Sequence, residues 1–425
     1  MSDITKFKNS ITLEPINLAS IVSPQEGDMA VDLSGDFNIY TSGSWIVSTA
    51  IPASVSNSTV CSFTNTFDLS TNSYQRIIPQ FSYTSPTKIP NPNTLPPATV
   101  YSCSWSPNGE FLAVGHDNTP FITIYQRSGT TLIKLTNPVT LPTGTGLGCS
   151  WSPNAEFLSI THSISPFVTI YQRSGTTFTK LANPATLPTG IGQFSSWSTN
   201  GEFLAVAHFT SPFLTIYQRS GTTFTKLTNP ATLPTGNCVD CSFSSDNRFL
   251  AVCNIAATPF ITIYERSGTT FTKLSDPVIL PTGGAASCSW SPNMEFLTIG
   301  HGNSPFITTY QRSGTTFTKL TDPITLPTAA VVSCMWSPNS LYLAILIPTA
   351  SPITSVYQRS GTILTKLPDP VSLPNGNGYG TAWSPNGEFL TVASGTTPFI
   401  QTYQTSSEIV EDTYLKIPKL KRAGT

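Results

Sequence analysis

The residues best suited to chemistry are the histidines and cysteines, and both recur at fixed spacings. All four histidines occupy one position of a repeated phrase, at the end of a mostly apolar run: His116, His162, His208 and His301. Imidazole binds metals and exchanges protons near neutral pH. One histidine per repeat would hold the rings too far apart for a tetrahedral site with bonds of about 2 Å. We expect a structural or rim role for these residues; the alternative is ligand contact on one face.

A second repeat position holds small side chains two residues before an aromatic one. Ser195 and Thr381 occupy it in two copies. Cysteine occupies it in the other five: Cys103, Cys149, Cys241, Cys288 and Cys334. The alternation among cysteine, serine and threonine indicates tight packing near a central axis around which the copies of the repeat are arranged. Cys238 and Cys241 form a single CxxC near Cys253, which is weak as a zinc site without a second pair or a histidine cluster. A Cys241–Cys253 disulfide is the other alternative.

Catalytic motifs are missing from the sequence. It contains no phosphate loop, no HExxH and no Gly-x-Ser-x-Gly. The acidic residues recur mostly at equivalent outer positions and do not converge in pairs, as acid–base catalysis would need. Every polar feature recurs with the repeat, whereas an active site normally breaks symmetry. We therefore expect no enzyme activity, no cofactor and no bound metal.

The charge of the chain excludes further classes of function. Only 10% of its 425 residues are charged, and the net charge is −1. A nucleic-acid-binding protein would need a strongly basic face, and a membrane-surface protein a polybasic segment. The first residues lack the apolar core of a secretory signal, and no apolar run approaches the length of about 18 residues that spans a membrane. We expect neither nucleic-acid binding nor membrane insertion.

An internal repeat organises these positions. Its anchor is an aromatic residue at spacings of 46, 46, 46, 47, 46 and 47 residues: Trp105, Trp151, Trp197, Phe243, Trp290, Trp336 and Trp383. We expect these rings in the core, with a carbohydrate-stacking ring as the alternative. Six of the copies also place a lysine near their end: Lys134, Lys180, Lys226, Lys273, Lys319 and Lys366. Lysine on an outer strand discourages edge-to-edge pairing.

Each copy contains four strand-like runs. In the first copy they are YSCSW, EFLAVGH, FITIYQ and TTLIKL, separated by turns such as Ser106-Pro107-Asn108-Gly109. The second and third runs are almost continuously apolar, which is typical of strands buried on both faces. Four antiparallel strands repeated every 40 to 50 residues predict the blades of a β-propeller. The expected fold is all-β, with seven four-stranded antiparallel blades.

Charged residues flank the middle strands of each copy. In most copies a glutamate begins the second strand and an arginine ends the third, as in Glu110 and Arg127. In the fourth copy Arg248 replaces the glutamate and Glu265 stands beside Arg266, so the charges are exchanged. Antiparallel neighbours place these strand ends side by side. We expect surface cross-strand pairs, each contributing less than about 1 kcal/mol.

The phrase SWSPNGEFLAVGH resembles the strand–turn–strand segment of WD-repeat propellers. The resemblance extends over residues 100–417 and implies a propeller, a fold whose usual role is protein interaction. The Trp-Asp pair that names the family is replaced by Tyr125-Gln126, and the Gly-His pair before the first strand is absent. The hydrogen-bonded tetrad of that family is therefore not expected.

Three segments follow from the repeat: residues 1–99 as a small β region and linker, 100–417 as the propeller, and 418–425 as a tail. A degenerate eighth blade within 57–99 is the alternative to seven blades. Either Thr87–Ile89 or Tyr414–Ile417 would supply the outer strand that closes the ring.

The N-terminal region carries hairpin signals of its own. Residues 28–49 hold short β runs separated by Ser34-Gly35-Asp36 and Ser42-Gly43-Ser44. The pattern Gly27-Asp28, Asp32, Tyr40, Gly43 and Trp45 resembles a β motif of bacteriophage tail-fibre and other virion proteins, and the near-identical Thr-rich repeats resemble WD-like units of phage structural proteins.

These resemblances imply a non-enzymatic structural protein on a phage capsid or tail. Residues 1–99 would bind other virion proteins, and the propeller would decorate the particle or contact a host-surface protein or glycan, with homo-oligomers as an option. An intracellular interaction scaffold, located in the cytoplasm, and a glycan-binding propeller lectin are the alternatives.

Overall fold

The computed structural model describes residues 29–31, 37–41, 44–48, 86–348 and 351–405. Every regular element in these ranges is a β-strand. The described residues contain no helix long and apolar enough to cross a membrane. The chain divides into two compact units, one formed by Met1–Ser82 with Ser407–Thr425 and the other by Tyr83–Ser406.

The first unit contains a three-stranded antiparallel sheet. Its strands are β1 (Met29–Val31), β2 (Phe37–Thr41) and β3 (Ser44–Ser48), in that order across the sheet. These strands lie where the sequence predicts short β runs. The predicted turn Ser34-Gly35-Asp36 lies outside the described residues, as does all of Ser42-Gly43-Ser44 except Ser44. The rest of residues 1–85 lies outside them as well.

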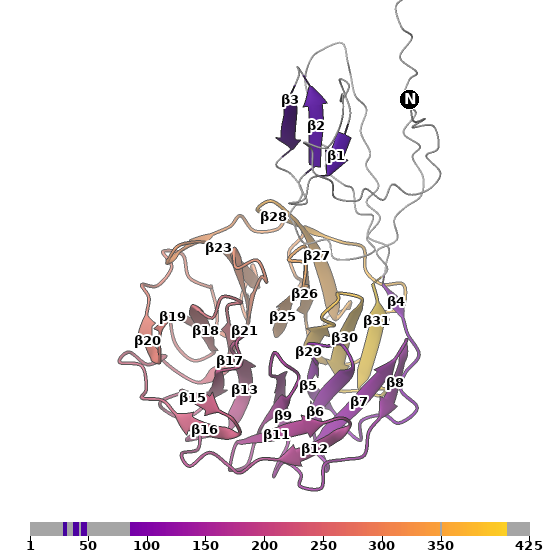
Figure 1. Cartoon of the computed structure of the whole chain (residues 1–425), viewed down its shortest axis with the longest axis vertical. Coiled ribbons are helices and arrows are strands. Elements are labelled where there is room, and N and C mark those ends of the chain that lie inside the picture. Colours follow the sequence, from indigo (N-terminus) through magenta and orange to yellow (C-terminus); the bar gives the residue numbers. More distant parts are fainter. Residues whose placement is uncertain (1–28, 32–36, 42–43, 49–85, 349–350, 406–425) are drawn as a thin grey trace, which may run out of the picture. The chain divides into compact units, whose positions relative to one another are not determined.

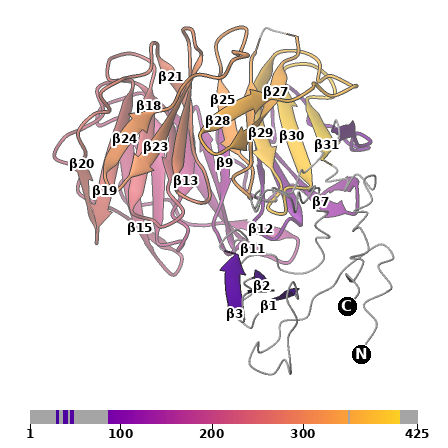
Figure 2. The ribbon, with the colours of Figure 1, turned by 90° about the horizontal axis from the view of Figure 1, so that it is seen from above.

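The second unit is a β-propeller of seven four-stranded blades, seen along its axis in Figure 1 and from the side in Figure 2. This confirms the predicted fold class. The first blade consists of β5 (Val100–Trp105), β6 (Phe111–His116), β7 (Ile122–Ser128) and β8 (Thr131–Lys134). In each blade the first strand is innermost and the fourth outermost.

Five further blades repeat this order. Their strands are β9 (Gly146–Trp151), β10 (Phe157–His162), β11 (Val168–Ser174), β12 (Thr177–Lys180); β13 (Gly192–Trp197), β14 (Phe203–His208), β15 (Leu214–Ser220), β16 (Thr223–Lys226); β17 (Cys238–Phe243), β18 (Phe249–Asn254), β19 (Ile261–Ser267), β20 (Thr270–Lys273); β21 (Ala285–Trp290), β22 (Phe296–His301), β23 (Ile307–Ser313), β24 (Thr316–Lys319); β25 (Ser333–Trp336), β26 (Tyr342–Leu346), β27 (Thr354–Ser360) and β28 (Ile363–Lys366).

The seventh blade takes its outer strand from the N-terminal side of the ring. It combines β29 (Gly378–Trp383), β30 (Phe389–Ser394) and β31 (Ile400–Gln404) with β4 (Thr87–Lys88). Tyr403 pairs with Lys88, and the N–H of Ile89 donates to the carbonyl of Thr402 at 2.9 Å. Of the two segments that could close the ring, Thr87–Ile89 therefore does so, and Tyr414–Ile417 lies outside the described residues.

The closure changes the expected boundaries. The propeller unit extends from Tyr83 to Ser406, so it begins before residue 100 and ends before residue 417. The segment 86–99 forms the closing strand and the connection into the first blade, and no eighth blade is formed within the described residues.

Each blade is stabilised locally by the turn between its first two strands. In the first blade the Ser106 hydroxyl donates to the Asn108 side-chain oxygen at 2.6 Å and accepts the N–H of Phe111 at 2.9 Å. Gly109 follows with a φ of +69°, a left-handed conformation that suits glycine. The Ser-Pro-Asn-Gly phrase thus sets the register of the first hairpin.

The hydrophobic core lies between blades. Trp151 of β9 stacks on Phe111 of β6 at a ring-centroid distance of 6.0 Å, and its Nε1 donates to the carbonyl of Ser104 at 3.1 Å. Trp105 makes the equivalent stack on Phe389 at 5.9 Å, which joins the first blade to the last. Because the aromatic anchors pack on the preceding blade, the ring is held together by equivalent apolar joints.

Candidate functional site

The four histidines end the second strand of their blades, as the repeat predicts, but they are fully buried. The Nδ1 of His116 lies 2.7 Å from the carbonyl oxygen of Asp117, and its Nε2 lies 3.0 Å from the hydroxyl of Thr123. A carbonyl oxygen only accepts, so Nδ1 carries the proton and Nε2 accepts from the hydroxyl. In the fifth blade the Nε2 of His301 lies 2.9 Å from the hydroxyl of Thr308.

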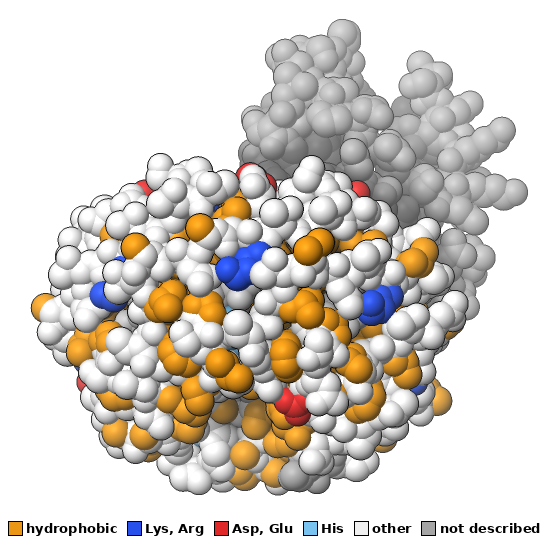
Figure 3. Space-filling model, turned by 90° about the horizontal axis from the view of Figure 1, so that it is seen from below, with side chains coloured by type: hydrophobic (Ala, Val, Ile, Leu, Met, Phe, Trp, Pro, Cys, Tyr) orange, Lys and Arg blue, Asp and Glu red, His pale blue; other side chains and the backbone are white. Residues whose placement is uncertain are grey.

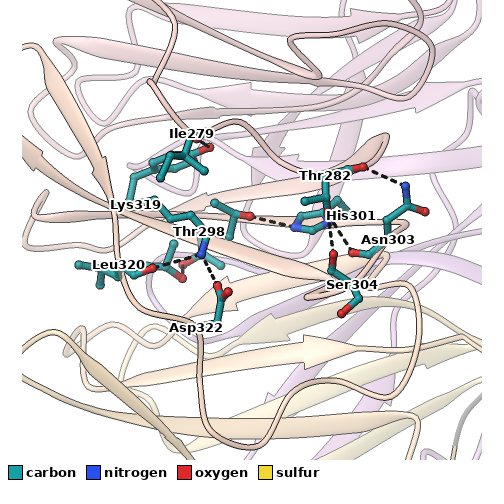
Figure 4. Close-up of polar contacts among 12 residues, drawn as sticks. Ile279, Thr282, Thr298, His301, Asn303, Ser304, Lys319, Leu320 and Asp322 are labelled. Carbon is teal, nitrogen blue, oxygen red and sulfur yellow. Dashed lines mark hydrogen bonds and ion pairs between the residues drawn. The ribbon is translucent and has the colours of Figure 1, made fainter.

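Burial keeps these rings neutral. It lowers the pKa of His162 and of His208 to about 4, and it lowers the pKa of His116 and His301 as well. The ring is further enclosed by loop contacts: the Thr282 hydroxyl donates to the carbonyl of Ser304 at 2.8 Å beside His301 (Figure 4). The structure therefore places the histidines in the blade interior, and they do not form a ligand-contacting ring on one face.

The Cys241–Cys253 disulfide, which the sequence left as an alternative, is not formed. Cys238, Cys241 and Cys253 are buried free thiols, and among the described residues no group of His, Cys, Asp and Glu side chains is placed to hold a metal ion. The repeat-position cysteines pack against the second strand of the preceding blade; the Cys149 thiol, for example, lies 3.4 Å from the carbonyl of Ala113 in β6.

The aromatic anchors are core residues. None of the seven is more than 7% exposed, so none offers a free ring face to a sugar: Trp105, Trp151, Trp197, Phe243, Trp290, Trp336 and Trp383. The lysines end the outer strands, where Lys319 donates to the carbonyl of Leu320 and pairs with Asp322 at 2.5 Å (Figure 4). Lys134 makes the same two contacts with Leu135 and Asn137.

The expected side-chain pair between Glu110 and Arg127 is not formed. Glu110 instead accepts from the side chain of Asn108 at 2.7 Å, within its own turn. Arg127 donates to the carbonyls of Gly109 and Gly129, and its guanidinium lies 5.3 Å from the ring centroid of Phe389 in the preceding blade. Because the Glu110 carboxylate bonds Asn108 in its own turn, the Arg127 side chain contacts the neighbouring blade instead.

The exchanged charges of the fourth blade do form an ion pair. Arg248 Nη2 lies 2.7 Å from Glu265 Oε1. Glu265 occupies the position of a glutamine in other copies, where Gln172 donates to Glu156 at 2.9 Å. The side chain that begins the second strand therefore bonds the side chain that precedes the arginine of the third strand, and not the arginine itself.

A cavity of about 500 Å³ lies on the propeller axis. Residues from all seven innermost strands line it: β5, β9, β13, β17, β21, β25 and β29. The residues at two repeat positions line it. At the first position the side chains are polar, aromatic and aliphatic, among them Tyr101, Gln193 and Tyr379. At the second position most are serines, including Ser104 and Ser150. Cavities of this volume accommodate small molecules.

Asp240 of β17 is the one Asp, Glu, Lys or Arg among the described residues that line this cavity. Its Oδ1 accepts the N–H of Cys241 at 2.8 Å, and its Oδ2 accepts the N–H of Cys288 in the next blade at 2.9 Å. Burial raises its pKa to about 7 despite these bonds, to which the Ser287 hydroxyl adds a third. This carboxylate breaks the sevenfold symmetry inside the ring.

Sequence reasoning missed Asp240, although a signal was present. The fourth copy reads VDCSF where the first reads YSCSW. Equivalent residues elsewhere are small or apolar, namely Ser102, Gly148, Phe194, Ser287, Ser333 and Gly380. An acidic residue at this one inner position is an asymmetric feature of the kind that a binding site requires.

A second asymmetric feature lies in the wall of the same cavity. The rings of Tyr101 and Tyr379 meet edge to face at a centroid distance of 5.1 Å. The Tyr101 hydroxyl donates to Asp117 at 2.9 Å, and burial together with this carboxylate raises the pKa of Tyr101 to about 12. Asp117 also accepts from Thr145 at 2.9 Å, which fixes the tyrosine in place.

The outer surface presents a repeated apolar feature. In the loop after each outer strand, one side chain is exposed at the same repeat position, and we call this set the apolar loop ring: Val139, Ala185, Ala231, Val278, Ile324 and Val371. Val139 and Ile324 are as exposed as in an extended chain, at 102% and 101%. Figure 3 shows a side of the propeller on which hydrophobic side chains lie among uncharged polar ones and charged groups are sparse.

Comparisons with known proteins agree with this architecture. Residues 92–122 match the family model described as WD domain, G-beta repeat, and no curated protein matches the sequence. Among solved structures, hydrazine synthase of Kuenenia stuttgartiensis aligns with a TM-score of 0.58 at 11% identity, over 74% of this chain and 98% of that one. A chain of a structure titled "Crystal Structure of Mitotic Checkpoint Complex" aligns with a TM-score of 0.57 at 17% identity, over 78% and 98%.

Identities this low establish a shared fold and nothing further about activity. The matched segment 92–122 contains the innermost strand β5 and the second strand β6 of the first blade, together with the turn between them. Combined with the seven four-stranded blades, this match makes the chain a WD-repeat-like β-propeller.

Proposed function

We propose that this chain is a non-enzymatic structural protein of a bacteriophage virion, in which the N-terminal region binds the particle and the propeller decorates it or contacts a host surface. The observation that carries the proposal is the closure of the ring by β4. The chain completes the propeller from Thr87 onward without the sheet β1–β3, which belongs to a separate unit and is the part that would bind another virion protein.

The propeller surface supports a contact with a protein partner. Fully exposed branched side chains such as Val139 and Ile324 recur around the ring, and apolar side chains form the central part of many protein interfaces. The burial of the seven aromatic anchors removes the main argument for a glycan-stacking lectin. We therefore favour a host-surface or virion protein as the partner.

The test is immunogold electron microscopy of purified phage particles with an antibody against residues 100–405. Label at a fixed place on head or tail is the expected result, and the place separates decoration from attachment. Particles that contain their other structural proteins but carry no label would overturn the virion role and favour a soluble interaction propeller.

Two variants separate anchoring from attachment. Deletion of residues 2–82 in the phage genome should abolish the label, since the propeller unit begins at Tyr83. Replacing Val139 and Ile324 by asparagine, the residue at the equivalent exposed position Asn93, should preserve the label and reduce adsorption to host cells if the propeller is the attachment surface. Unchanged adsorption would assign the propeller to decoration.

A further inference from the structure

We propose that the axial cavity binds a small organic cation, a primary ammonium compound, with Asp240 as its counter-charge. This small-molecule site is independent of any role of the protein in a particle. It rests on the composition of the cavity wall, the hydrogen-bonding state of the carboxylate and the aromatic pair Tyr101–Tyr379.

The cavity contains one carboxylate and no basic side chain among its lining residues in the described part of the chain. Buried charges in proteins are normally paired, because transfer of an isolated ion out of water is costly. Asp240 receives only neutral donors from the protein, namely two backbone N–H groups and the Ser287 hydroxyl. A cation in the cavity would supply the compensation that the protein itself does not.

The carboxylate also has acceptor capacity to spare. An ionised carboxylate offers about four lone-pair sites, and the three protein donors occupy three of them. Joining two blades at this repeat position does not need a carboxylate. The Ser102 hydroxyl accepts the N–H of Cys149 in the next blade at 3.2 Å, and the Ser287 hydroxyl accepts the N–H of Cys334 at 3.2 Å. A neutral hydroxyl therefore suffices to join two blades.

The remaining wall suits the two ends of an alkylammonium ion. Ser196 and Ser242 also line the cavity. The Ser196 hydroxyl accepts the N–H of Phe243 at 3.1 Å and has a second lone pair for a ligand N–H group. Tyr101 and Tyr379 offer aromatic surface to the ligand's charge or its alkyl part, and Val239 adds aliphatic surface. A volume of about 500 Å³ is far larger than a bare metal ion requires.

The experiment is isothermal titration of the full-length protein with n-butylammonium chloride at pH 8. Saturable one-site binding is expected. n-Butanol, which has the same alkyl chain without the charge, should bind at least tenfold more weakly, and potassium chloride at equal ionic strength should give no saturable heat. Equal affinity for n-butanol, saturable binding of potassium, or no saturable binding of n-butylammonium would overturn the proposal.

Two variants locate the site. Asp240→Ser, which restores the residue of three other blades, should weaken n-butylammonium binding at least tenfold; an unchanged affinity in a variant with a native circular-dichroism spectrum would overturn the proposal. Tyr379→Leu introduces the side chain that Leu147 has at the equivalent position of the second blade. This variant leaves Asp240 intact and should weaken binding severalfold. If Asp240→Ser fails to fold, undiminished binding by Tyr379→Leu overturns the proposal instead.

Discussion

The carboxylate of Asp240 accepts the backbone N–H of Cys288 at 2.9 Å, across the boundary between the fourth and fifth blades. At the boundary between the sixth and seventh blades the Ser333 hydroxyl accepts the N–H of Thr381 at 3.3 Å. The fourth blade thus carries an ionisable group where other blades carry a neutral one. Its burial links the stability of the ring to pH.

Replacing Asp240 by serine should change the pH dependence of stability. The pKa of Asp240 is raised from 3.8 to about 7 by burial, so between these values the folded protein holds a proton that the unfolded chain has released. Its contribution to stability is fully present below about pH 4 and is lost as the pH rises through about 7, on a scale of about 1.4 kcal/mol per unit of pKa difference. Asp240→Ser should remove this decline, measured by urea unfolding from pH 4 to 8.

The neighbouring thiols do not titrate in that window. Burial raises the pKa of Cys241 and Cys288 well above the ordinary value and that of Cys253 to about 11. As a control, Ser102→Ala removes a neutral inter-blade hydrogen bond and should cost about 1 kcal/mol at every pH. Parallel stability curves for the wild type and Asp240→Ser would contradict the prediction.

The buried histidines should oppose this trend. The pKa of His162 is lowered from 6.5 to about 4, so the unfolded chain binds a proton between these values that the folded protein does not. The stability associated with the neutral ring is fully present above about pH 6.5 and is lost as the pH falls through about 4. His162→Asn should flatten this acid loss, measured as the difference in unfolding free energy between pH 7.5 and 4.5.

Asparagine is the matched replacement because Asn254 occupies this position in the fourth blade. There its side-chain oxygen accepts the N–H of Ala257 at 3.0 Å. At pH 7.5 the variant should be less stable than the wild type, since the bond between His162 and Thr169 is lost. An acid loss equal to that of the wild type would show that His162 does not titrate between the two states.

Arginines at the ends of the third strands should stabilise the ring through the neighbouring blade. The Arg219 guanidinium donates to the carbonyl of Gly201 at 2.7 Å and lies 5.0 Å from the ring centroid of Phe157. Arg219→Gln should therefore destabilise the protein by about 1–2 kcal/mol. Urea unfolding at 0.05 and 0.5 M sodium chloride measures the effect and its salt dependence.

Glu202→Gln is the control that separates this contact from an ion pair. Glu202 accepts from Asn200 and Gln218 and makes no ion pair with Arg219 among the described contacts. Its replacement should change stability by less than about 0.5 kcal/mol, and the effect of Arg219→Gln should hardly depend on salt. Equal losses for both variants, abolished by salt, would restore the ion-pair interpretation.

The repeat predicted the blades because each strand carries its own pattern and the first turn of each copy carries a version of the Ser-Pro-Asn-Gly phrase. The spacing could not show which partner a side chain chooses when two lie within reach. Glu110 and Arg127 are neighbours through the backbone, where the N–H of Arg127 donates to the carbonyl of Glu110 at 2.7 Å, yet their side chains bond elsewhere. The histidines were placed at the correct strand end, but their burial depends on how the adjoining loops fold, as those of Thr282 and Ser304 do beside His301.

Asp240 shows the same limit for the candidate site. A single acidic residue in one copy predicts an asymmetry, but the axial cavity exists only once seven strands distant in sequence surround it. Ring closure is a further case, because Thr87–Ile89 and Tyr414–Ile417 are both short β-like segments. Pairing of β4 with β31 depends on the packed position of Ile89, which local pattern does not reveal.

Ile89 should therefore be important for closure of the ring. Its side chain is buried in the cluster that contains Trp105 and Phe389, and its N–H bonds the carbonyl of Thr402. Ile89→Ala should destabilise the protein by about 2–4 kcal/mol, measured by urea unfolding. Thr87→Ala, at an exposed position of the same strand, is the matched control and should cost less than about 0.5 kcal/mol. Equal stability of the two variants would argue against closure by β4.

Phe243 should be the one aromatic anchor whose replacement stabilises the ring. In neighbouring blades the anchor is a tryptophan whose Nε1 donates to a carbonyl of the preceding blade, as Trp290 does to Ser242 at 3.1 Å. Phenylalanine keeps the apolar packing, since Phe243 is 7% exposed and contacts Phe271 edge to face at 6.2 Å, but it has no such donor. Phe243→Trp should add about 1 kcal/mol to the free energy of unfolding.

The control for that substitution is Phe243→Leu, which shortens the side chain without adding a donor and should cost about 1–3 kcal/mol. Both variants are measured by urea unfolding at pH 7.5, with near-ultraviolet circular dichroism to verify packing. A loss of stability in Phe243→Trp would mean that the joint between the third and fourth blades is narrower than the others, because overpacking then outweighs the added hydrogen bond. A gain would show that the fourth blade departs from the repeat at the expense of stability, as expected where a chain has acquired a site.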